Sequence, residues 1–123
     1  ILYVENVKQT LDFFCNAFNL RKKFLHESGD YGELDTGSTT LSFSSISLMN
    51  GLGKSPAKAK PEAPTFEIAF ETNDVAKSLA RALEAGATLV QDLRNEPWGQ
   101  TTSYVAEPNG YLIEICSPVQ GQS

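Results

Sequence analysis

The sequence predicts an α+β fold built from two βαβββ modules, and an internal repeat is the main observation behind this prediction. The segment at residues 2–11 recurs in pattern at residues 70–79, and residues 40–43 recur at residues 112–115. A repeat of roughly half the chain indicates two similar supersecondary units. In each half, one segment of helical periodicity is followed by three segments of strand type. We therefore expect a curved mixed sheet, with helices on its outer face and a concave cleft on the other.

The first module is expected over residues 1–49. Asn6 is a suitable N-cap, and apolar residues then recur at helical spacing as far as Asn19, which would end the helix in a left-handed conformation. Turn-forming residues at 28–30 and 35–38 separate the strands that follow. The expected elements are a strand at 1–4, a helix at 7–18, and strands at 21–27, 31–36 and 39–45.

Residues 50–64 are expected to connect the modules. Glycines and prolines exclude a regular element from this segment, and lysines keep it solvated. A structureless connection of this length is unusual in a compact domain, so the segment should be mobile or functional. We expect one domain over residues 1–123, in which this linker joins the two modules.

The second module is expected over residues 65–118 and repeats the order of the first. Asp74 is the predicted N-cap of its helix, and Gly86 is the predicted terminator. The expected elements are a strand at 65–71, a helix between Asp74 and Gly86, a strand at 88–94, a loop at 95–100, and strands at 101–106 and 111–116 around a turn at 107–110.

Composition and charge argue against several classes of partner. The formal net charge is -5 at pH 7 and the sequence pI is about 4.8, which argues against a nucleic-acid partner because phosphate binding needs clustered Lys and Arg. The sequence contains no apolar run as long as a membrane span. Its two cysteines, Cys15 and Cys116, are too few for a disulfide scaffold. A reducing, cytoplasmic location is therefore expected.

Alternation along the strands predicts which side chains point away from the helices. Ile113 and Ile115 should meet the helices, which leaves Glu114 on the free face of the sheet. Glu67 should share that face, and Ser42 should lie on the free face of the first module. Two carboxylates on a partly apolar surface can bind a metal ion, share a proton, or act as acid and base. The alternative is that each is simply solvated, as exposed carboxylates usually are.

The chain resembles the vicinal oxygen chelate superfamily, which includes glyoxalase I, extradiol dioxygenases and bleomycin resistance proteins. The resemblance covers essentially the whole chain and rests on the paired modules and on three segments, YVENV at 3–7, LDFF at 11–14 and EPNGYLIEI at 107–115. Because this fold hosts several chemistries, the resemblance is specific for the fold and weak for the reaction. It also implies a homodimer that binds a small molecule in a sheet-lined cleft.

By this resemblance, the metal positions of the family fall on the first and last strands of each module. Glu114 matches the last-strand acid of the second module, and Glu67 matches a position that is most often His in the metal enzymes. Ser42 matches the position that is Glu in glyoxalase I, and the remaining position would lie two residues before Ile1. The only histidine, His26, is expected in a strand of the first module, away from these positions.

Two functions of different class follow from the resemblance. In the first, Glu67 and Glu114 hold a divalent ion (Mg, Mn, Ni or Zn), and one of them moves a proton in a lyase or isomerase of the lactoylglutathione-lyase type. In the second, no metal binds, and an acidic cleft sequesters a cationic aromatic drug as bleomycin resistance proteins do. The acidic pI and the lost ligand positions favour the second function, whereas the retained Glu114 favours the first. An extradiol-type dioxygenase is a distant third, because a two-His iron triad is not matched.

Several further side chains complete the candidate ligand-binding set. Trp98 could stack on a flat ligand and Gln100 could hydrogen-bond it, unless their loop is a tight turn in which Trp98 covers a core edge. Cys116 shares the face of Glu114 and, with no evident activator, is expected to be a small apolar filler. The candidate set for substrate binding is Ser42, Tyr3, Trp98, Gln100 and Cys116.

Overall fold

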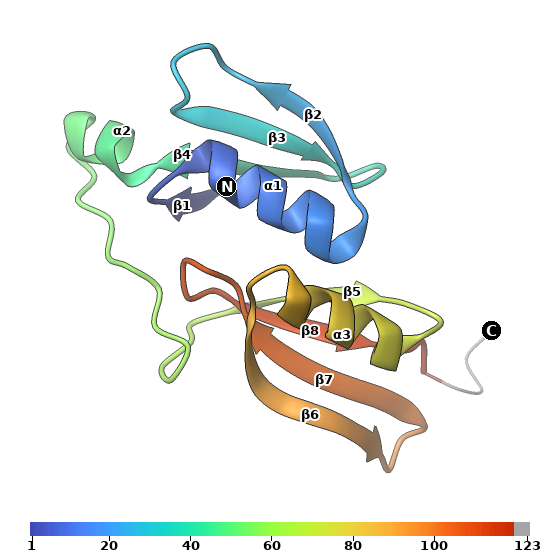
Figure 1. Cartoon of the computed structure of the whole chain (residues 1–123). Coiled ribbons are helices and arrows are strands. Elements are labelled where there is room, and N and C mark those ends of the chain that lie inside the picture. Colours follow the sequence, from blue (N-terminus) through green and yellow to red (C-terminus); the bar gives the residue numbers. More distant parts are fainter. Residues whose placement is uncertain (120–123) are drawn as a thin grey trace. The chain divides into compact units, whose positions relative to one another are not determined.

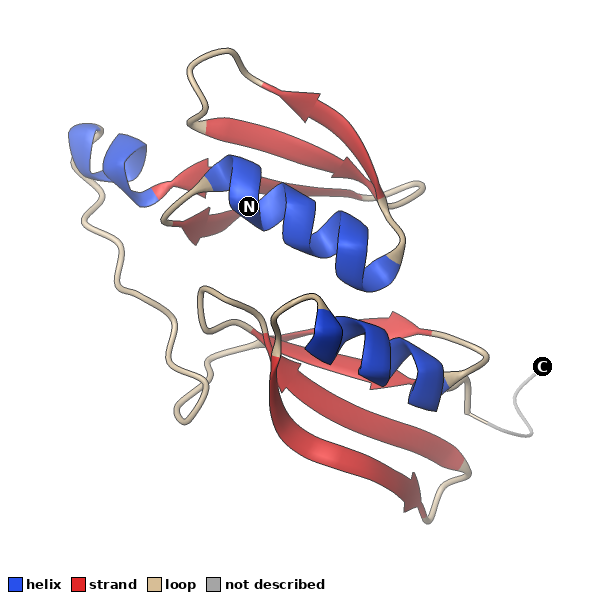
Figure 2. Ribbon diagram, in the orientation of Figure 1, coloured by secondary structure: helices blue, strands red, loops and turns tan. Residues whose placement is uncertain are grey.

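The computed structural model describes residues 1–119 and divides into two compact units. Unit 1 comprises Ile1–Lys58 and unit 2 comprises Ala59–Ser123. Each unit contains one four-stranded mixed sheet with a helix packed on one face (Figure 1, Figure 2). The two sheets have the same strand order under the sequence repeat: the first strand of each unit lies beside the fourth, followed by the third and the second. The order of elements along the chain is the predicted βαβββ in each unit. The organisation of the units into a single domain stays a prediction.

Unit 1 follows the predicted order of one strand, one helix and three strands. Asn6 caps α1 through its Oδ1 atom, which accepts a hydrogen bond from the Gln9 backbone N–H at 2.9 Å. Asn19 ends the helix with φ 56°, the left-handed cap that the sequence predicts. The elements are β1 (Leu2–Val4), α1 (Val7–Phe18), β2 (Arg21–Leu25), β3 (Tyr31–Asp35), β4 (Thr40–Ser45) and α2 (Ile46–Gly51).

The short helix α2 was not predicted from the sequence. Ser45 ends β4 and also caps α2, because its Oγ atom accepts a hydrogen bond from the Leu48 backbone N–H at 3.0 Å. Met49 is buried and attaches the helix to unit 1. The predicted linker therefore begins with the last turn of a helix, and it has no helix or strand after Gly51 until β5 begins at Glu67.

Unit 2 also follows the predicted order. The carboxylate of Asp74 caps α3 by accepting from the Lys77 backbone N–H at 3.1 Å. The predicted loop at 95–100 is shorter in the structure, because β6 continues to Glu96 and β7 begins at Gln100. The elements are β5 (Glu67–Glu71), α3 (Val75–Glu84), β6 (Thr88–Glu96), β7 (Gln100–Ala106) and β8 (Leu112–Cys116).

The core of unit 2 lies between α3 and the sheet. Ile113 and Ile115 are fully buried, as the alternation in the last strand predicts. Their partners across the ladder include Ile68 and Val105, so these side chains share the face that α3 covers. Alternation along the predicted strand at 65–71 would also place Phe66 under the helix, but Phe66 precedes β5, is 51% exposed, and its ring lies 5.8 Å from that of Tyr111. Within residues 1–119 no helix is long and apolar enough to cross a membrane.

Candidate functional site

The sheet of unit 2 has one face covered by α3 and a second face, which we call the unit-2 open face. Because cross-strand partners point to the same side and neighbours along a strand to opposite sides, the ladder assigns each side chain to a face. Ala69, Glu114 and Tyr104 are partners in one row across β5, β8 and β7. The polar side chains assigned to the unit-2 open face are Glu67, Glu71, Glu114, Cys116, Tyr104, Thr102, Gln100, Thr88, Gln91, Arg94 and Glu96.

Tyr104 connects the two glutamates that the sequence singles out. Its hydroxyl donates a hydrogen bond to the Glu114 carboxylate at 3.1 Å. Burial, then the hydrogen bond and charge of Glu114, and then the charge and hydrogen bonding of Glu67 raise the pKa of Tyr104 well above its usual value. The phenol is therefore a neutral hydrogen-bond donor at physiological pH. The carboxylates of both Glu67 and Glu114 interact with its hydroxyl and disfavour its ionisation. The structure thus places the two glutamates around one polar group.

Tyr104 was not identified from the sequence. The signal was available, because residues 101–106 and 111–116 were predicted as strands on either side of a tight turn. Such a hairpin places a residue near the middle of the first strand opposite one near the middle of the second. In the structure this pair is Tyr104 and Glu114.

Cys116 lies on the same face, but its side chain is almost completely buried. It is 3% exposed, and its Sγ atom lies 3.7 Å from the Phe70 carbonyl oxygen. Burial, together with the negative charge and hydrogen bonding of Glu114, raises the pKa of the Cys116 thiol to about 11. The group is therefore a neutral thiol at pH 7, which argues against a nucleophilic role. Its place in a ligand-binding set stays a prediction.

The β6–β7 side of the open face is held by hydrogen bonds. Arg94 Nε donates to Glu96 Oε1 at 2.6 Å, and the Thr102 hydroxyl donates to the same oxygen at 3.0 Å. The hydrogen bond from Arg94 is the main cause that lowers the pKa of Glu96. Gln91 Nε2 donates to the Thr102 hydroxyl at 3.2 Å. The Arg94 guanidinium is thus tied to Glu96, at the edge of the sheet.

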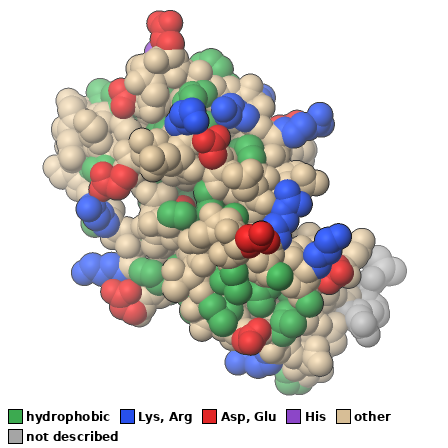
Figure 3. Space-filling model, viewed as in Figure 1, with side chains coloured by type: hydrophobic (Ala, Val, Ile, Leu, Met, Phe, Trp, Pro, Cys, Tyr) green, Lys and Arg blue, Asp and Glu red, His purple; other side chains and the backbone are tan. Residues whose placement is uncertain are grey.

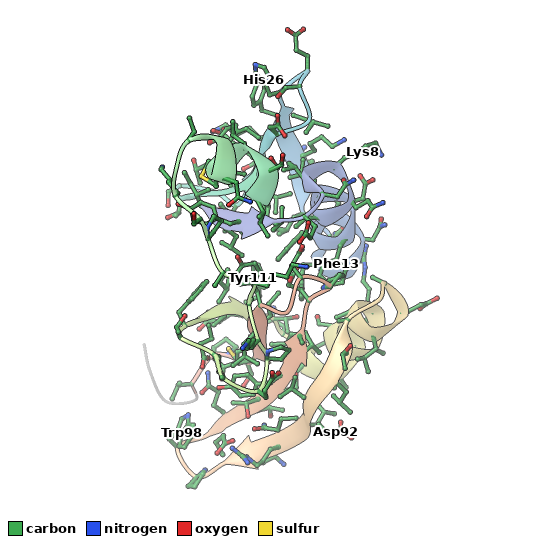
Figure 4. All side chains as sticks on the ribbon, turned by 90° about the vertical axis from the view of Figure 1, so that its left-hand side faces the viewer. Lys8, Phe13, His26, Asp92, Trp98 and Tyr111 are labelled. Atoms are coloured by element: carbon green, nitrogen blue, oxygen red, sulfur yellow. The ribbon has the colours of Figure 1, made fainter. Side chains whose placement is uncertain are left out.

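Trp98 and Gln100, predicted together as ligand contacts, interact directly. The indole Nε1 of Trp98 donates to Gln100 Oε1 at 2.7 Å, and Gln100 Nε2 donates to the Ser117 carbonyl at 2.9 Å. Trp98 lies at the tip of the β6–β7 hairpin (Figure 4) and is 55% exposed. The interpretation in which Trp98 covers a core edge is therefore disfavoured. The indole is instead an exposed ring whose orientation is set by Gln100.

The open face of the unit-1 sheet, opposite α1, carries Ser42 and Tyr3 on the neighbouring strands β4 and β1. Ser42 is buried, and its ladder partner on β3 is Glu33. The Tyr31 hydroxyl donates to Glu33 Oε2 at 2.7 Å. Hydrogen bonding to Ser42 lowers the pKa of Tyr31, but the hydrogen bond to Glu33, burial and the charge of Glu33 together raise it. Each sheet therefore carries a phenol–carboxylate pair on its open face, Tyr31–Glu33 in unit 1 and Tyr104–Glu114 in unit 2.

The described side chains do not complete a metal site of the kind that the resemblance implies. Within residues 1–119, no three His, Cys, Asp or Glu side chains lie close enough to hold one ion. Glu67 and Glu114 supply two carboxylates, and Tyr104 beside them is a neutral phenol, which is a poor ligand. His26 lies in the turn between β2 and β3 (Figure 4), and its Nδ1 atom is 2.8 Å from the Ser28 hydroxyl. The donor set matches neither a four-ligand glyoxalase site nor a two-His iron triad.

The two sides of unit 2 differ in chemical character. On the face seen in Figure 3, hydrophobic side chains gather over unit 2, in the region of α3 and the strands beside it, and the charged side chains are dispersed. Among the described residues of the unit-2 open face there are four carboxylates and one guanidinium, and this guanidinium is the one paired with Glu96. The open face is therefore the acidic side of the unit, and it attracts cations rather than anions.

Two βαβββ modules, with an acidic residue on the last strand of the second, define a glyoxalase-like protein. The family model described as the glyoxalase-like domain matches residues 1–120, and the chain belongs to this family. The chain is also 29% identical over 125 residues to an uncharacterized protein of Mycobacterium bovis, an alignment that covers 97% of this chain and 81% of that protein. A protein of Mycobacterium tuberculosis shows the same identity, with 72% of its length covered.

Solved structures agree with this assignment at the level of the fold. A glyoxalase-related enzyme from Fulvimarina pelagi superposes with a TM-score of 0.81 at 18% identity, covering 95% of this chain and 84% of that chain. A glyoxalase/bleomycin resistance protein/dioxygenase family enzyme from Burkholderia phytofirmans superposes with a TM-score of 0.80 at 18% identity, covering 94% and 93%. At these identities the likeness concerns the fold, and the activity has to be argued from the site.

Proposed function

We propose that the unit-2 open face binds a small organic cation and that this binding needs no metal ion. Glu67 and Glu114 supply the negative charge, and the Tyr104 hydroxyl helps to orient Glu114. The observation that carries the proposal is the convergence of both carboxylates on the Tyr104 hydroxyl, which lies 3.1 Å from Glu114. A cation placed between two carboxylates relieves their mutual repulsion, which gives the site a preference for positive charge.

A second feature of unit 2, its exposed tryptophan, supports recognition of a flat ligand in particular. The Trp98 indole, oriented through Gln100, presents an exposed aromatic ring in the same unit. Aromatic rings bind flat cations through stacking and through the attraction of a cation to the ring face. The predicted contacts of Ser42, Tyr3 and Cys116 with a ligand, and the sheet-lined cleft itself, stay predictions.

The proposal is tested by calorimetric titration in buffer that contains EDTA. Benzamidinium is a suitable probe because it is small, flat and cationic, and benzamide is its neutral counterpart. We expect benzamidinium to bind, benzamide to bind far more weakly, and Glu114→Gln or Glu67→Gln to weaken benzamidinium binding about tenfold or more. Glu84→Gln is the matched control, because Glu84 is an exposed carboxylate at the end of α3. Equal binding of the two probes would refute the proposal.

A metal-assisted lyase or isomerase is the second candidate function. It is favoured by one observation, that Glu67 and Glu114 lie on the same sheet face and act on one hydroxyl. A hard ion such as Mg²⁺ or Mn²⁺ accepts carboxylate oxygens, whereas Ni²⁺ and Zn²⁺ would ordinarily require further nitrogen or sulfur ligands. Elemental analysis after loading with each ion decides between the candidates. Near-stoichiometric retention that is lost in Glu67→Ala would make the metal-assisted function primary.

The homodimer implied by the resemblance also stays a prediction. Three apolar side chains of the edge strand β6, Leu89, Val90 and Leu93, are each at least 44% exposed in the single chain. Sedimentation velocity over a concentration series gives the mass in solution. A mass that equals one chain throughout the series would count against the dimer.

A further inference from the structure

We propose that unit 1 carries a second binding site for an organic cation, formed by Phe24, Tyr31 and Glu33 on the sheet face opposite α1. This group of three residues is named the unit-1 aromatic cluster. The site uses different residues from those of the proposed function and does not depend on it. The chemistry that would be recognised is a quaternary or aromatic ammonium group, bound by aromatic ring faces beside one carboxylate.

A β-bulge places Phe24 on the open face. Lys22 pairs with Leu34, but Phe24 pairs with Glu33, so one extra residue, Lys23, is inserted into β2. Leu34 is fully buried under α1, and side chains alternate along a strand. Without the bulge, Phe24 would therefore point to the same side of the sheet as Lys22 and Leu34. With the bulge it lies beside Glu33 and is 44% exposed.

Exposure of a large apolar side chain to solvent costs stability, because burial of a Phe side chain is favourable. Bulges that redirect side chains in this way are enriched at functional sites. On the α1-facing side the neighbouring position is already filled: Gly32 is packed against Leu11 and Val7 of α1, and even a Cβ atom there would lie 2.7 Å from Leu11. The bulge therefore leaves the Phe24 ring on the open face, beside Glu33 and accessible to a ligand.

The surroundings of Phe24 have the composition that organic cations favour. The Phe24 ring centroid lies 6.4 Å from that of Tyr31 and 6.2 Å from that of His26. The Tyr31 hydroxyl donates to Glu33 Oε2 at 2.7 Å, which fixes the carboxylate beside the rings. A cation over the Phe24 ring would therefore meet both the negative face of an aromatic system and a full negative charge.

Lys23 already offers a cation to this carboxylate, although weakly. Its Nζ atom lies 4.0 Å from Glu33 Oε1, and its side chain is 56% exposed. A long, solvated ion pair of this kind contributes little free energy, so a bound ligand can displace it. The ammonium of Lys23 competes with the ligand. Its removal should therefore strengthen binding, which a merely structural role for the cluster would not predict.

The test is a titration of the isotope-labelled whole chain by two-dimensional NMR, with choline as the probe and 3,3-dimethylbutanol as its neutral isostere. We expect choline to shift the resonances of Phe24, Tyr31 and Glu33, and the isostere to leave them unchanged. Phe24→Leu should weaken choline binding about three- to tenfold, because it removes the aromatic face but keeps an apolar side chain. Lys23→Gln should strengthen it about two- to fivefold.

Glu33→Gln and Asp35→Asn form a matched pair of charge-removing variants. Both residues lie on β3, but Asp35 is two positions away, and its side-chain oxygen accepts from the Gly37 backbone N–H, which Asn can also satisfy. Glu33→Gln should weaken choline binding about fivefold or more, and Asp35→Asn should leave it nearly unchanged. Equal effects of the two variants, or unchanged binding in Phe24→Leu, would overturn the proposal. Shifts confined to the neighbours of Glu114 would also overturn it, while leaving the proposed function of unit 2 intact.

Discussion

Tyr104 and Glu114 face each other across β7 and β8, and the phenol donates to the carboxylate at 3.1 Å. In unit 1 the corresponding pair is arranged differently. There the carboxylate, Glu33, and the phenol, Tyr31, lie on the same strand, two residues apart. Both sheets therefore hold a carboxylate with a tyrosine hydroxyl on the open face, although the repeated sequence does not place these residues at equivalent positions.

The hydrogen bond of Tyr104 predicts the effect of removing its hydroxyl. Tyr104→Phe should lower the free energy of unfolding at neutral pH by about 0.5–1.5 kcal/mol, because Glu114 loses a donor. The folded chain also holds the Tyr104 proton more tightly than the unfolded chain, since the pKa is raised above 10.0. This contribution to stability is fully present below pH 10.0 and is lost as the pH rises above it.

Urea unfolding below and above pH 10 checks this prediction. The wild-type chain should lose stability more steeply with rising pH than Tyr104→Phe does. Parallel curves for the two chains would show that the Tyr104 hydroxyl is not perturbed in the folded state.

The raised pKa of Cys116 predicts slow thiol chemistry. Relative to an ordinary thiol at pKa 9.0, a pKa of about 11 lowers the thiolate fraction near neutral pH about 100-fold. In a Cys15→Ala variant, which leaves Cys116 as the single thiol, labelling by Ellman's reagent should be slower than in urea by at least this factor. The converse variant, Cys116→Ala, retains the half-buried Cys15 and should react faster. Rapid labelling of Cys116 in the folded chain would contradict its burial.

Substitution of Gly110 is expected to cause a large loss of stability. It has a φ of +95°, and a Cβ atom there would lie 2.6 Å from the Ala59 carbonyl oxygen, which is a backbone atom that cannot move alone. Gly86 has a φ of +116° but has open space around the same position. Gly86→Ala should cost about 1–2 kcal/mol from the backbone conformation alone, and Gly110→Ala should cost clearly more. Equal costs in urea unfolding would mean that residues 59–61 do not pack on the β7–β8 turn.

The orientation of Trp98 can be followed directly, because it is the only tryptophan. Gln100→Ala removes the acceptor of the indole N–H, so the fluorescence anisotropy of Trp98 should fall and acrylamide quenching should rise. The free energy of unfolding should change by less than about 1 kcal/mol, since the indole is already exposed. Unchanged anisotropy would mean that the turn itself orients the ring.

Sequence reasoning succeeded where the determining contacts are local. Asn6, Asn19 and Asp74 were predicted as helix caps because each acts within its own turn of chain. The common face of Glu67 and Glu114 followed from alternation in two regular strands, which pair in the structure without a register shift. The positions of these residues could therefore be derived before the fold was known, whereas their roles could not.

The features that were missed depend on partners distant in the sequence. Phe24 reaches the open face through a bulge that is defined by its pairing with β3, and no pattern within β2 alone indicates it. Tyr104 matters because of its register against β8. The N-cap of helix α2, Ser45, is also the last residue of β4. The strand pattern accounts for Ser45 by itself, so there was no separate sign in the sequence that its hydroxyl caps a helix.

The central claim is that Glu67 and Glu114 act together on one cation, and a double-mutant cycle tests it most directly. Benzamidinium affinity would be measured in EDTA for the wild-type chain, Glu67→Gln, Glu114→Gln and the double variant. Two carboxylates that contact the same cation should show a coupling free energy of at least about 0.5 kcal/mol, with the second substitution costing less than the first. Strictly additive losses, or affinities that do not change in either single variant, would contradict the account.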